Sequence, residues 1–257
     1  MDTAATLLHP LPWRPGLAAD ATPPAESTAP PLLLLLDRRE PIAADLRERL
    51  VASLSAPERQ RLSAYRLAAD RERFLLGRGG LRTLLGQWLE LEPQAVPLEA
   101  GPHGKPHCPG GPAFNISHSG ELILLALHAS RPVGVDVERR RPALDWRAVA
   151  RRMLPMSEQQ ALEALPEAGR AEAFLAAWCR LEARLKARGD GLAGLERLIR
   201  QIDGASSEAA AAPGERLWEV AVPTGYRAAV ALASRTPQGP GGSAGSSRSI
   251  QSSGVSG

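Results

Sequence analysis

The sequence predicts an α+β fold made of two similar halves. Short apolar runs typical of strands alternate with longer segments of helical period, and the order strand, helices, strands occurs twice. Of the 257 residues, 44% are apolar, which is enough for a sizeable core. No residue-level repeat is visible, so the two halves are inferred from topology alone. We divide the chain into a poorly ordered segment, an N-terminal half, a C-terminal half and a disordered Gly/Ser-rich tail: 1–31, 32–131, 132–235 and 236–257.

The N-terminal half is expected to begin with a strand, because five leucines at Leu32–Leu36 are closed by Asp37. Leucines at every fourth position predict the first helix. Ser55 followed by Glu58 forms a capping box for the second helix. The expected elements are a strand at Leu32–Leu36, helices at Ile42–Leu54, from Ser55 to about Arg66, and at Ala69–Leu91, a loop at Glu99–Gly111, and strands at Phe114–Ser117 and Leu122–His128.

The C-terminal half follows the same order. Pro155 separates two helical pieces, and Gly189-Asp190-Gly191 ends a long helix. A turn at Pro223-Thr224-Gly225 closes a final hairpin. The expected elements are a strand at Val133–Glu138, helices at Arg147–Met153, Glu158–Leu165 and Ala171–Arg188, and strands at Trp218–Val222 and Arg227–Ala233.

Charge and composition exclude several function classes. The formal net charge of +3 suits anionic ligands or acidic partners but is too small to indicate nucleic-acid binding. No run reaches the roughly 18–20 apolar residues that span a bilayer, and the N-terminus lacks the layout of a secretory signal. Cys108 and Cys179 are interpreted as free thiols in a reducing compartment. We therefore expect a cytoplasmic protein that enters no membrane.

Two segments place three carboxylates and a lysine where they can meet. In the strand Gly134-Val135-Asp136-Val137-Glu138, both acids lie on one face. In the later helix, Glu182 and Lys186 lie one turn apart. Hard oxygen ligands beside a cation donor are what a Mg²⁺–pyrophosphate site requires. Each pair also has an ordinary interpretation, as the wet face of a half-buried strand or as a solvated helical salt bridge.

Two further motifs can contact phosphate. Phe114-Asn115-Ile116-Ser117-His118-Ser119-Gly120 offers an amide, hydroxyls and an imidazole before a glycine turn, although such residues also cap ordinary hairpins. Gly104-Lys105-Pro106 holds a lysine in a loop, where it can clamp phosphate or simply face water.

In combination these motifs resemble the 4′-phosphopantetheinyl transferases of the larger, single-chain Sfp-like type. The order G-K-P, F-N-x-S-H-S-G, G-x-D-x-E and W-x-x-x-E-A-x-x-K is similar to that family from about Leu32 to Ala233. The resemblance implies a pseudo-dimer of two α+β halves with the ligand cleft between them. It implies Mg²⁺-dependent transfer of the phosphopantetheine arm of coenzyme A to a serine of an apo acyl or peptidyl carrier protein, releasing adenosine 3′,5′-bisphosphate. A monomer is expected, since both halves lie on one chain.

Residue roles follow from the same resemblance. Asp136, Glu138 and Glu182 would bind Mg²⁺, and Glu182 would also act as general base. Lys186 would steady charge on the departing phosphate and bind the coenzyme. The remaining coenzyme contacts would come from Ser117 and His118, the second also counted as catalytic, and from Lys105, Arg61, Arg73 and Arg78. One position departs from the family pattern: Leu181 stands where lysine is frequent, with Arg180 before it.

The segment Arg139–Met153 is a candidate docking surface for an acidic carrier protein. It carries six arginines between Arg139 and Arg152, with an apolar stripe that includes Leu144 and Trp146. A solvated arginine face is the alternative. Two other functions stay open at this point: a Mg²⁺-dependent phosphohydrolase or nucleotidyl transferase, and a non-catalytic module that binds coenzyme A or a carrier. Carriers of fatty-acid, polyketide, nonribosomal-peptide and lysine biosynthesis all stay open as substrates.

Overall fold

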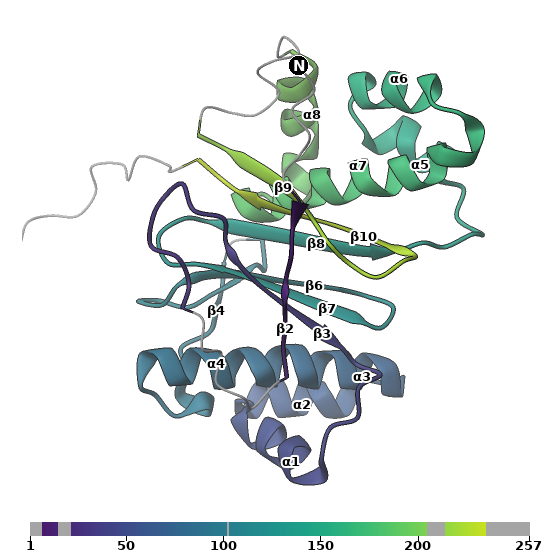
Figure 1. Ribbon diagram of the computed structural model, residues 1–257. Helices are drawn as coiled ribbons and strands as arrows, with labels where there is room; N and C mark the ends of the chain where they lie inside the picture. The colour runs from purple at the N-terminus through teal and green to yellow at the C-terminus, as the bar shows by residue number, and fades with distance from the viewer. Residues whose placement is uncertain (1–6, 15–21, 102, 205–213, 235–257) are drawn as a thin grey trace, which may run out of the picture.

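The computed structural model describes residues 7–14, 22–101, 103–204 and 214–234. Two sheets lie face to face, with one group of helices covering the outer face of each (Figure 1). The fold is therefore mixed α and β, with two similar halves, as the sequence predicted.

In the N-terminal half, leucine-rich strands pair behind a helical layer. The predicted helix over Ala69–Leu91 is interrupted at its centre by one π-helical turn, and the capping box at Ser55 and Glu58 is present. The elements are β3 Leu32–Asp37, α1 Ala44–Ser53, α2 Ala56–Ala64, α3 Ala68–Phe74, the π turn Leu75–Gly79, α4 Gly80–Leu89, a 3₁₀ turn Pro93–Ala95, β4 Glu99–Ala100, β5 Pro106–His107, β6 Ala113–Ser119 and β7 Leu122–His128.

The C-terminal half repeats the order strand, helices, strands. Gly189 ends its longest helix in the left-handed region at φ 75°, as its position in the sequence indicated. The elements are β8 Val133–Arg139, α5 Trp146–Met153, α6 Met156–Ala164, α7 Glu167–Arg188, a 3₁₀ turn Leu192–Gly194, α8 Leu195–Asp203, β9 Arg216–Val220 and β10 Tyr226–Leu232. Helix α8 was not predicted. The predicted C-terminal tail, 236–257, lies outside the described residues.

The two sheets share one strand arrangement. In the N-terminal sheet the order is β2-β3-β7-β6, and in the C-terminal sheet it is β1-β9-β10-β8. The last long strand of each half, β7 or β10, is thus central and antiparallel to both neighbours. Strands β6 and β8 lie at the edges of their sheets, which leaves alternate backbone groups of each open for other partners.

Two short strands in the described part of the N-terminal segment join the two sheets, where the sequence predicted poor order; residues 1–6 and 15–21 of that prediction lie outside the described residues. Strand β1 (Leu7–Leu8) pairs parallel with β9, and β2 (Leu11–Pro12) pairs parallel with β3. The following residue, Trp13, is buried in the N-terminal core. Pairings of two residues have no periodicity that the sequence could reveal, so only the contact by Trp13 was foreseeable.

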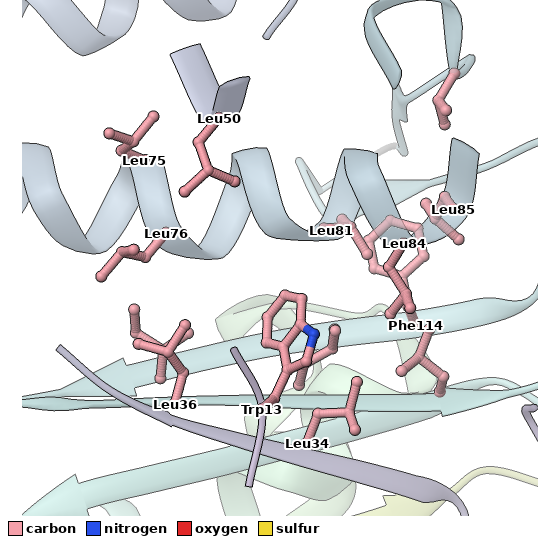
Figure 2. Close-up of a cluster of buried hydrophobic side chains, with 14 of the residues drawn as sticks. Trp13, Leu34, Leu36, Leu50, Leu75, Leu76, Leu81, Leu84, Leu85 and Phe114 are labelled. Carbon is pink, nitrogen blue, oxygen red and sulfur yellow. The ribbon is translucent and has the colours of Figure 1, made fainter. Parts of the chain in front are cut away.

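Three layers of apolar side chains hold the fold together. Figure 2 shows the first, in which Trp13 and leucines fill the space between the N-terminal sheet and its helices. The second lies between the sheets and includes Val135 and Val137 of β8. The third packs α7 on the C-terminal sheet and then α5, α6 and α8 on α7. Both cysteines are free, as predicted, and the structure shows that both are buried. None of the described helices is long and apolar enough to cross a membrane.

Candidate active site

The predicted carboxylates of strand β8 face helix α7. Val135 and Val137 point into the layer between the sheets, so Asp136 and Glu138 point the other way. From α7, the Lys186 ammonium nitrogen lies 2.5 Å from Oδ1 of Asp136 and 3.7 Å from Oε2 of Glu182. The structure therefore brings these residues from two separate elements to one place.

Helix α7 approaches strand β8 closely because small residues line the contact. Cys179, Ala183 and Ala187 of the helix pack on alanines of β10. At Gly134, an added Cβ would lie 2.1 Å from both the carbonyl oxygen of Ala183 and the amide nitrogen of Ala187. Only glycine allows the two backbones to approach this far, and the approach places Glu182 and Lys186 over the β8 acids.

The electrostatics of this cluster favour a cation. Burial raises the pKa of Glu138 and of Glu182, and in both cases the negative charge of Asp136 raises it further. Burial alone would lower the pKa of Lys186, but the Asp136 and Glu182 carboxylates outweigh it and raise that pKa. Three acids therefore share the Lys186 ammonium group and the exposed Arg141 guanidinium, and negative charge remains for a further cation to balance.

The donor set fits a hard divalent cation. Carboxylate oxygens are the ligands that Mg²⁺ prefers, and Oδ2 of Asp136 is buried without a hydrogen-bond partner in the described structure. Among the described residues, no group of three or more His, Cys, Asp or Glu side chains is already arranged to hold a metal ion. The Lys186 ammonium group lies between Asp136 and Glu182, which accounts for the separation of these carboxylates.

Beside the carboxylates, a cleft opens between the two halves. One cavity of about 280 Å³ is lined by Glu182, Lys186 and the loop at Gly104-Lys105-Pro106. It adjoins a second of about 310 Å³, with Gly104, Pro106 and Asn115 in the walls of both. The predicted basic residues of the coenzyme site line this second cavity: Arg61, Arg73, Arg78 and His118.

Each of the three arginines is held by a neighbouring group. The Arg61 guanidinium lies over the rings of Phe74 and Tyr65, at 5.2 Å and 6.0 Å from their centroids. Arg73 donates to the carbonyl oxygen of Gly120 at 2.9 Å.

Arg78 and His118 line the same cavity as Arg61 and Arg73. Nε of Arg78 lies 3.5 Å from Oε1 of Glu58. Partial desolvation and the charge of Arg73 lower the pKa of His118, which favours its neutral form. The cavity wall thus combines three permanent cations with one titratable donor.

Two residues that were predicted to contact the coenzyme, Ser117 and Lys105, have hydrogen-bond partners within the protein. Ser117 donates to Oδ1 of Asp136 at 2.9 Å. The Lys105 ammonium group donates to the carbonyl oxygens of Val133 at 2.9 Å and Lys186 at 2.6 Å, and burial lowers the pKa of Lys105 to about 8. Lys105 thus ties the G-K-P loop to β8 and to the end of α7. Contacts of Ser117 and Lys105 with a coenzyme stay predictions.

The departure at Leu181 has a structural explanation. Leu181 is 3% exposed and packs with the apolar side chains of α5, α6 and α8, on the side of α7 away from the carboxylates. Arg180 pairs with Glu158 of α6 and Glu219 of β9. Neither residue faces the site, so neither replaces the family's frequent lysine there.

The docking candidate Arg139–Met153 is only partly as expected. Its apolar stripe faces inward, because Trp146, Val149 and Met153 pack against the α7 layer. Six arginines remain exposed around it, and Leu144 is 41% exposed. The surface of this segment is therefore mainly basic.

Sequence reasoning missed the role of three polar residues. Asn115 and Ser119 of β6 bond to the β8 backbone, and the Tyr226 hydroxyl accepts from the Glu121 amide at 3.0 Å. The signal for the first two was present as N-x-S-x-S, since alternate strand residues share a face. It was interpreted as a phosphate-binding motif instead.

Comparison with known proteins identifies the family of the chain. Residues 132–231 match the model of the 4′-phosphopantetheinyl transferase superfamily, and residues 39–130 match that of 4′-phosphopantetheinyl transferase, N-terminal. The chain is 36% identical over 190 residues to 4′-phosphopantetheinyl transferase HetI of Nostoc sp., covering 72% of this chain and 80% of HetI. It is 28% identical to 4′-phosphopantetheinyl transferase Sfp of Bacillus subtilis, covering 62% and 70%. Over 121 residues it is 37% identical to AcpT of Escherichia coli K12, covering 46% and 58%. The chain belongs to the 4′-phosphopantetheinyl transferase superfamily.

Proposed function

We propose that this chain transfers the 4′-phosphopantetheine arm of coenzyme A to a serine of an apo carrier protein and releases adenosine 3′,5′-bisphosphate. The observation that carries the proposal is the meeting of Asp136, Glu138, Glu182 and Lys186 beside a cleft with arginines in its wall. Acids that hold a cation and arginines that bind phosphate are the two needs of a pyrophosphate substrate.

Asp136, Glu138 and Glu182 would hold Mg²⁺. The buried, unpartnered Oδ2 of Asp136 and the raised pKa values of the two glutamates support this assignment, because a cation would relieve both. When bound, Mg²⁺ supplies positive charge to the pyrophosphate oxygens.

Glu182 is the proposed general base. Its raised pKa makes it a better proton acceptor than an exposed glutamate, and its side chain borders the cleft. Glu182 takes the proton of the carrier serine, whose oxygen then forms a bond to the β-phosphorus. The bond from that phosphorus to the bridging oxygen breaks, and adenosine 3′,5′-bisphosphate leaves with the electron pair. Lys186 balances charge on the departing phosphate.

The coenzyme would lie along the two adjoining cavities. We assign its phosphate contacts to Arg61, Arg73, Arg78 and His118, whose side chains line the larger one. Three of these are permanent cations, and guanidinium groups match phosphate geometry well.

A carrier protein would dock on the basic segment Arg139–Met153. This segment follows β8 directly, so a carrier bound there would bring its serine near Glu138 and Glu182. Its exposed arginines suit an acidic partner. A monomer and a cytoplasmic location stay predictions.

One assay tests this function against its alternatives. The protein is incubated with coenzyme A, Mg²⁺ and an apo carrier domain, and the carrier is measured by intact mass. We expect a gain of one phosphopantetheine, which EDTA abolishes. Release of phosphate from nucleotides without a carrier would instead indicate a hydrolase. Binding of coenzyme A without modification of any carrier in a panel would indicate a binding module.

A further inference from the structure

Strand β8 is an edge strand whose open side is completed by side chains of β6. Three of its backbone N–H groups, at alternate residues, donate to polar side chains instead of to another strand. The bonds are Val135 N to Asn115 Oδ1 (2.9 Å), Val137 N to Ser117 Oγ (3.2 Å) and Arg139 N to Ser119 Oγ (3.1 Å). We call this arrangement the β6–β8 seam. It joins the two halves along the strand that carries two of the site's acids.

Two members of the seam also touch those acids. The Ser117 hydroxyl donates to Oδ1 of Asp136 at 2.9 Å, and the Ser119 hydroxyl donates to Oε2 of Glu138 at 2.8 Å. A serine hydroxyl has a single proton. Because the backbone N–H occupies an acceptor position on the oxygen, the proton is left for the carboxylate. Each serine therefore couples the backbone position of β8 to the orientation of an acid.

The coupling matters most for Glu138. Asp136 has a short side chain that is also bound by Lys186, whereas Glu138 has a longer side chain and lies near the end of its strand. Its other partner is Arg141, at 3.6 Å, whose side chain is 66% exposed. An exposed pair of this kind fixes little. Ser119 is buried at 5% exposure and is the rigid partner of Glu138.

We propose that Ser119 is a positioning residue, which holds the Glu138 carboxylate in the orientation that binds the metal. Hydrogen bonds from such outer groups fix the direction of a ligand before the metal arrives. The inference rests on the proposed function, in which Glu138 is a metal ligand.

The test compares Ser119→Ala with Asn115→Ala. Each variant removes one bond of the seam and leaves one β8 N–H without its side-chain acceptor, but only Ser119 touches a carboxylate. Mn²⁺ binding is measured by electron paramagnetic resonance without coenzyme A, and thermal unfolding is measured in parallel. Glu138→Gln is included to test the ligand itself.

We expect both seam variants to lower the melting temperature by similar amounts. We expect the Mn²⁺ dissociation constant to rise about tenfold in Ser119→Ala and less than about twofold in Asn115→Ala. Ser119→Thr, which keeps the hydroxyl, should restore binding. If Ser119→Ala does not fold, Ser119→Cys replaces it, because it keeps the volume and weakens the donor.

Two different results would overturn the inference, and they can be told apart. If Glu138→Gln weakens Mn²⁺ binding but Ser119→Ala does not, Ser119 is only structural and the metal assignment stands. If Glu138→Gln also leaves Mn²⁺ binding unchanged, the metal assignment of the proposed function fails, and the role of Ser119 fails with it.

Discussion

The helical layers of the two halves pack on their sheets in different ways. On the N-terminal sheet, α1 to α4 pack through leucines and Trp13. On the C-terminal sheet, α7 packs through alanine, cysteine and the bare backbone of Gly134. Large side chains fill space and stabilise the first half, whereas small ones let the α7 backbone approach β8 in the second. The acids of the proposed active site are found at the close contact, so the packing there determines their geometry.

The largest effect is expected at Gly134. In Gly134→Ala the new Cβ would meet backbone atoms at 2.1 Å, and backbone cannot give way as a flexible side chain can. We expect the free energy of unfolding to fall by more than about 4 kcal/mol and transfer to be lost. Gly169→Ala, in helix α7, is the control, since its Cβ would meet nothing within 4 Å. Chemical denaturation measures both variants, and equal stability of the two would contradict the account.

The corresponding change in the N-terminal layer is Leu81→Ala. Leu81 is fully buried among leucines, so its removal leaves a cavity and should lower the free energy of unfolding by about 3 kcal/mol. Because this layer supplies stability and no part of the acid cluster, kcat of the folded enzyme should stay within about twofold of wild type. A tenfold loss of kcat at a temperature where the variant is folded would show that both layers shape the site.

Leu181→Lys tests whether the departure from the family pattern weakens this enzyme. Leu181 faces the α5, α6 and α8 layer, so a lysine there would be buried among apolar groups. We expect a loss of about 2 kcal/mol of stability and no gain in transfer rate. A variant with a faster rate than wild type would show that the lysine can reach the active site.

The smallest effect concerns Lys105, which joins the G-K-P loop to β8 and α7. Its pKa of about 8 in the folded chain lies below the ordinary value of 10.5. Between these pH values the unfolded chain therefore binds more protons than the folded chain. The free energy of unfolding should therefore rise with pH across this window, relative to Lys105→Met. Allowing for partial exposure, the difference should reach about 1 to 2 kcal/mol in denaturation measured from pH 8 to 10.5. If the free energies of unfolding of wild type and Lys105→Met changed with pH in parallel, burial of the Lys105 charge would be excluded.

The sequence predicted most of the long elements because each has a local signal. The leucine run of β3, the capping box of α2 and the glycine that ends α7 are signals within a few residues. Strands β1 and β2 have none, because two-residue pairings depend on partners far away in the chain. Helix α8 did have a signal, since Leu195, Leu198 and Ile202 repeat at helical spacing, and it was overlooked.

The same distinction between local signals and distant partners applies to the candidate site. Alternation along β8 and the one-turn spacing on α7 correctly put Asp136 and Glu138 on one face and brought Lys186 to Asp136. The partners of Ser117 and Lys105 could not be predicted. Ser117 binds a carboxylate and Lys105 binds backbone carbonyl groups, and these partners lie in the other half of the chain. The environment of Leu181 likewise depends on how three helices pack around α7.

The most direct test of the account is the intact mass of an apo carrier after incubation with Glu182→Gln, coenzyme A and Mg²⁺. Glutamine keeps the size of the side chain but cannot accept the serine proton or supply the same charge to a cation. We predict that wild type adds one phosphopantetheine and that the variant, with an unchanged melting temperature, adds none in the same time. Modification by the variant at a rate near that of wild type would contradict the assignment of Glu182 and, with it, the role of the close α7–β8 contact.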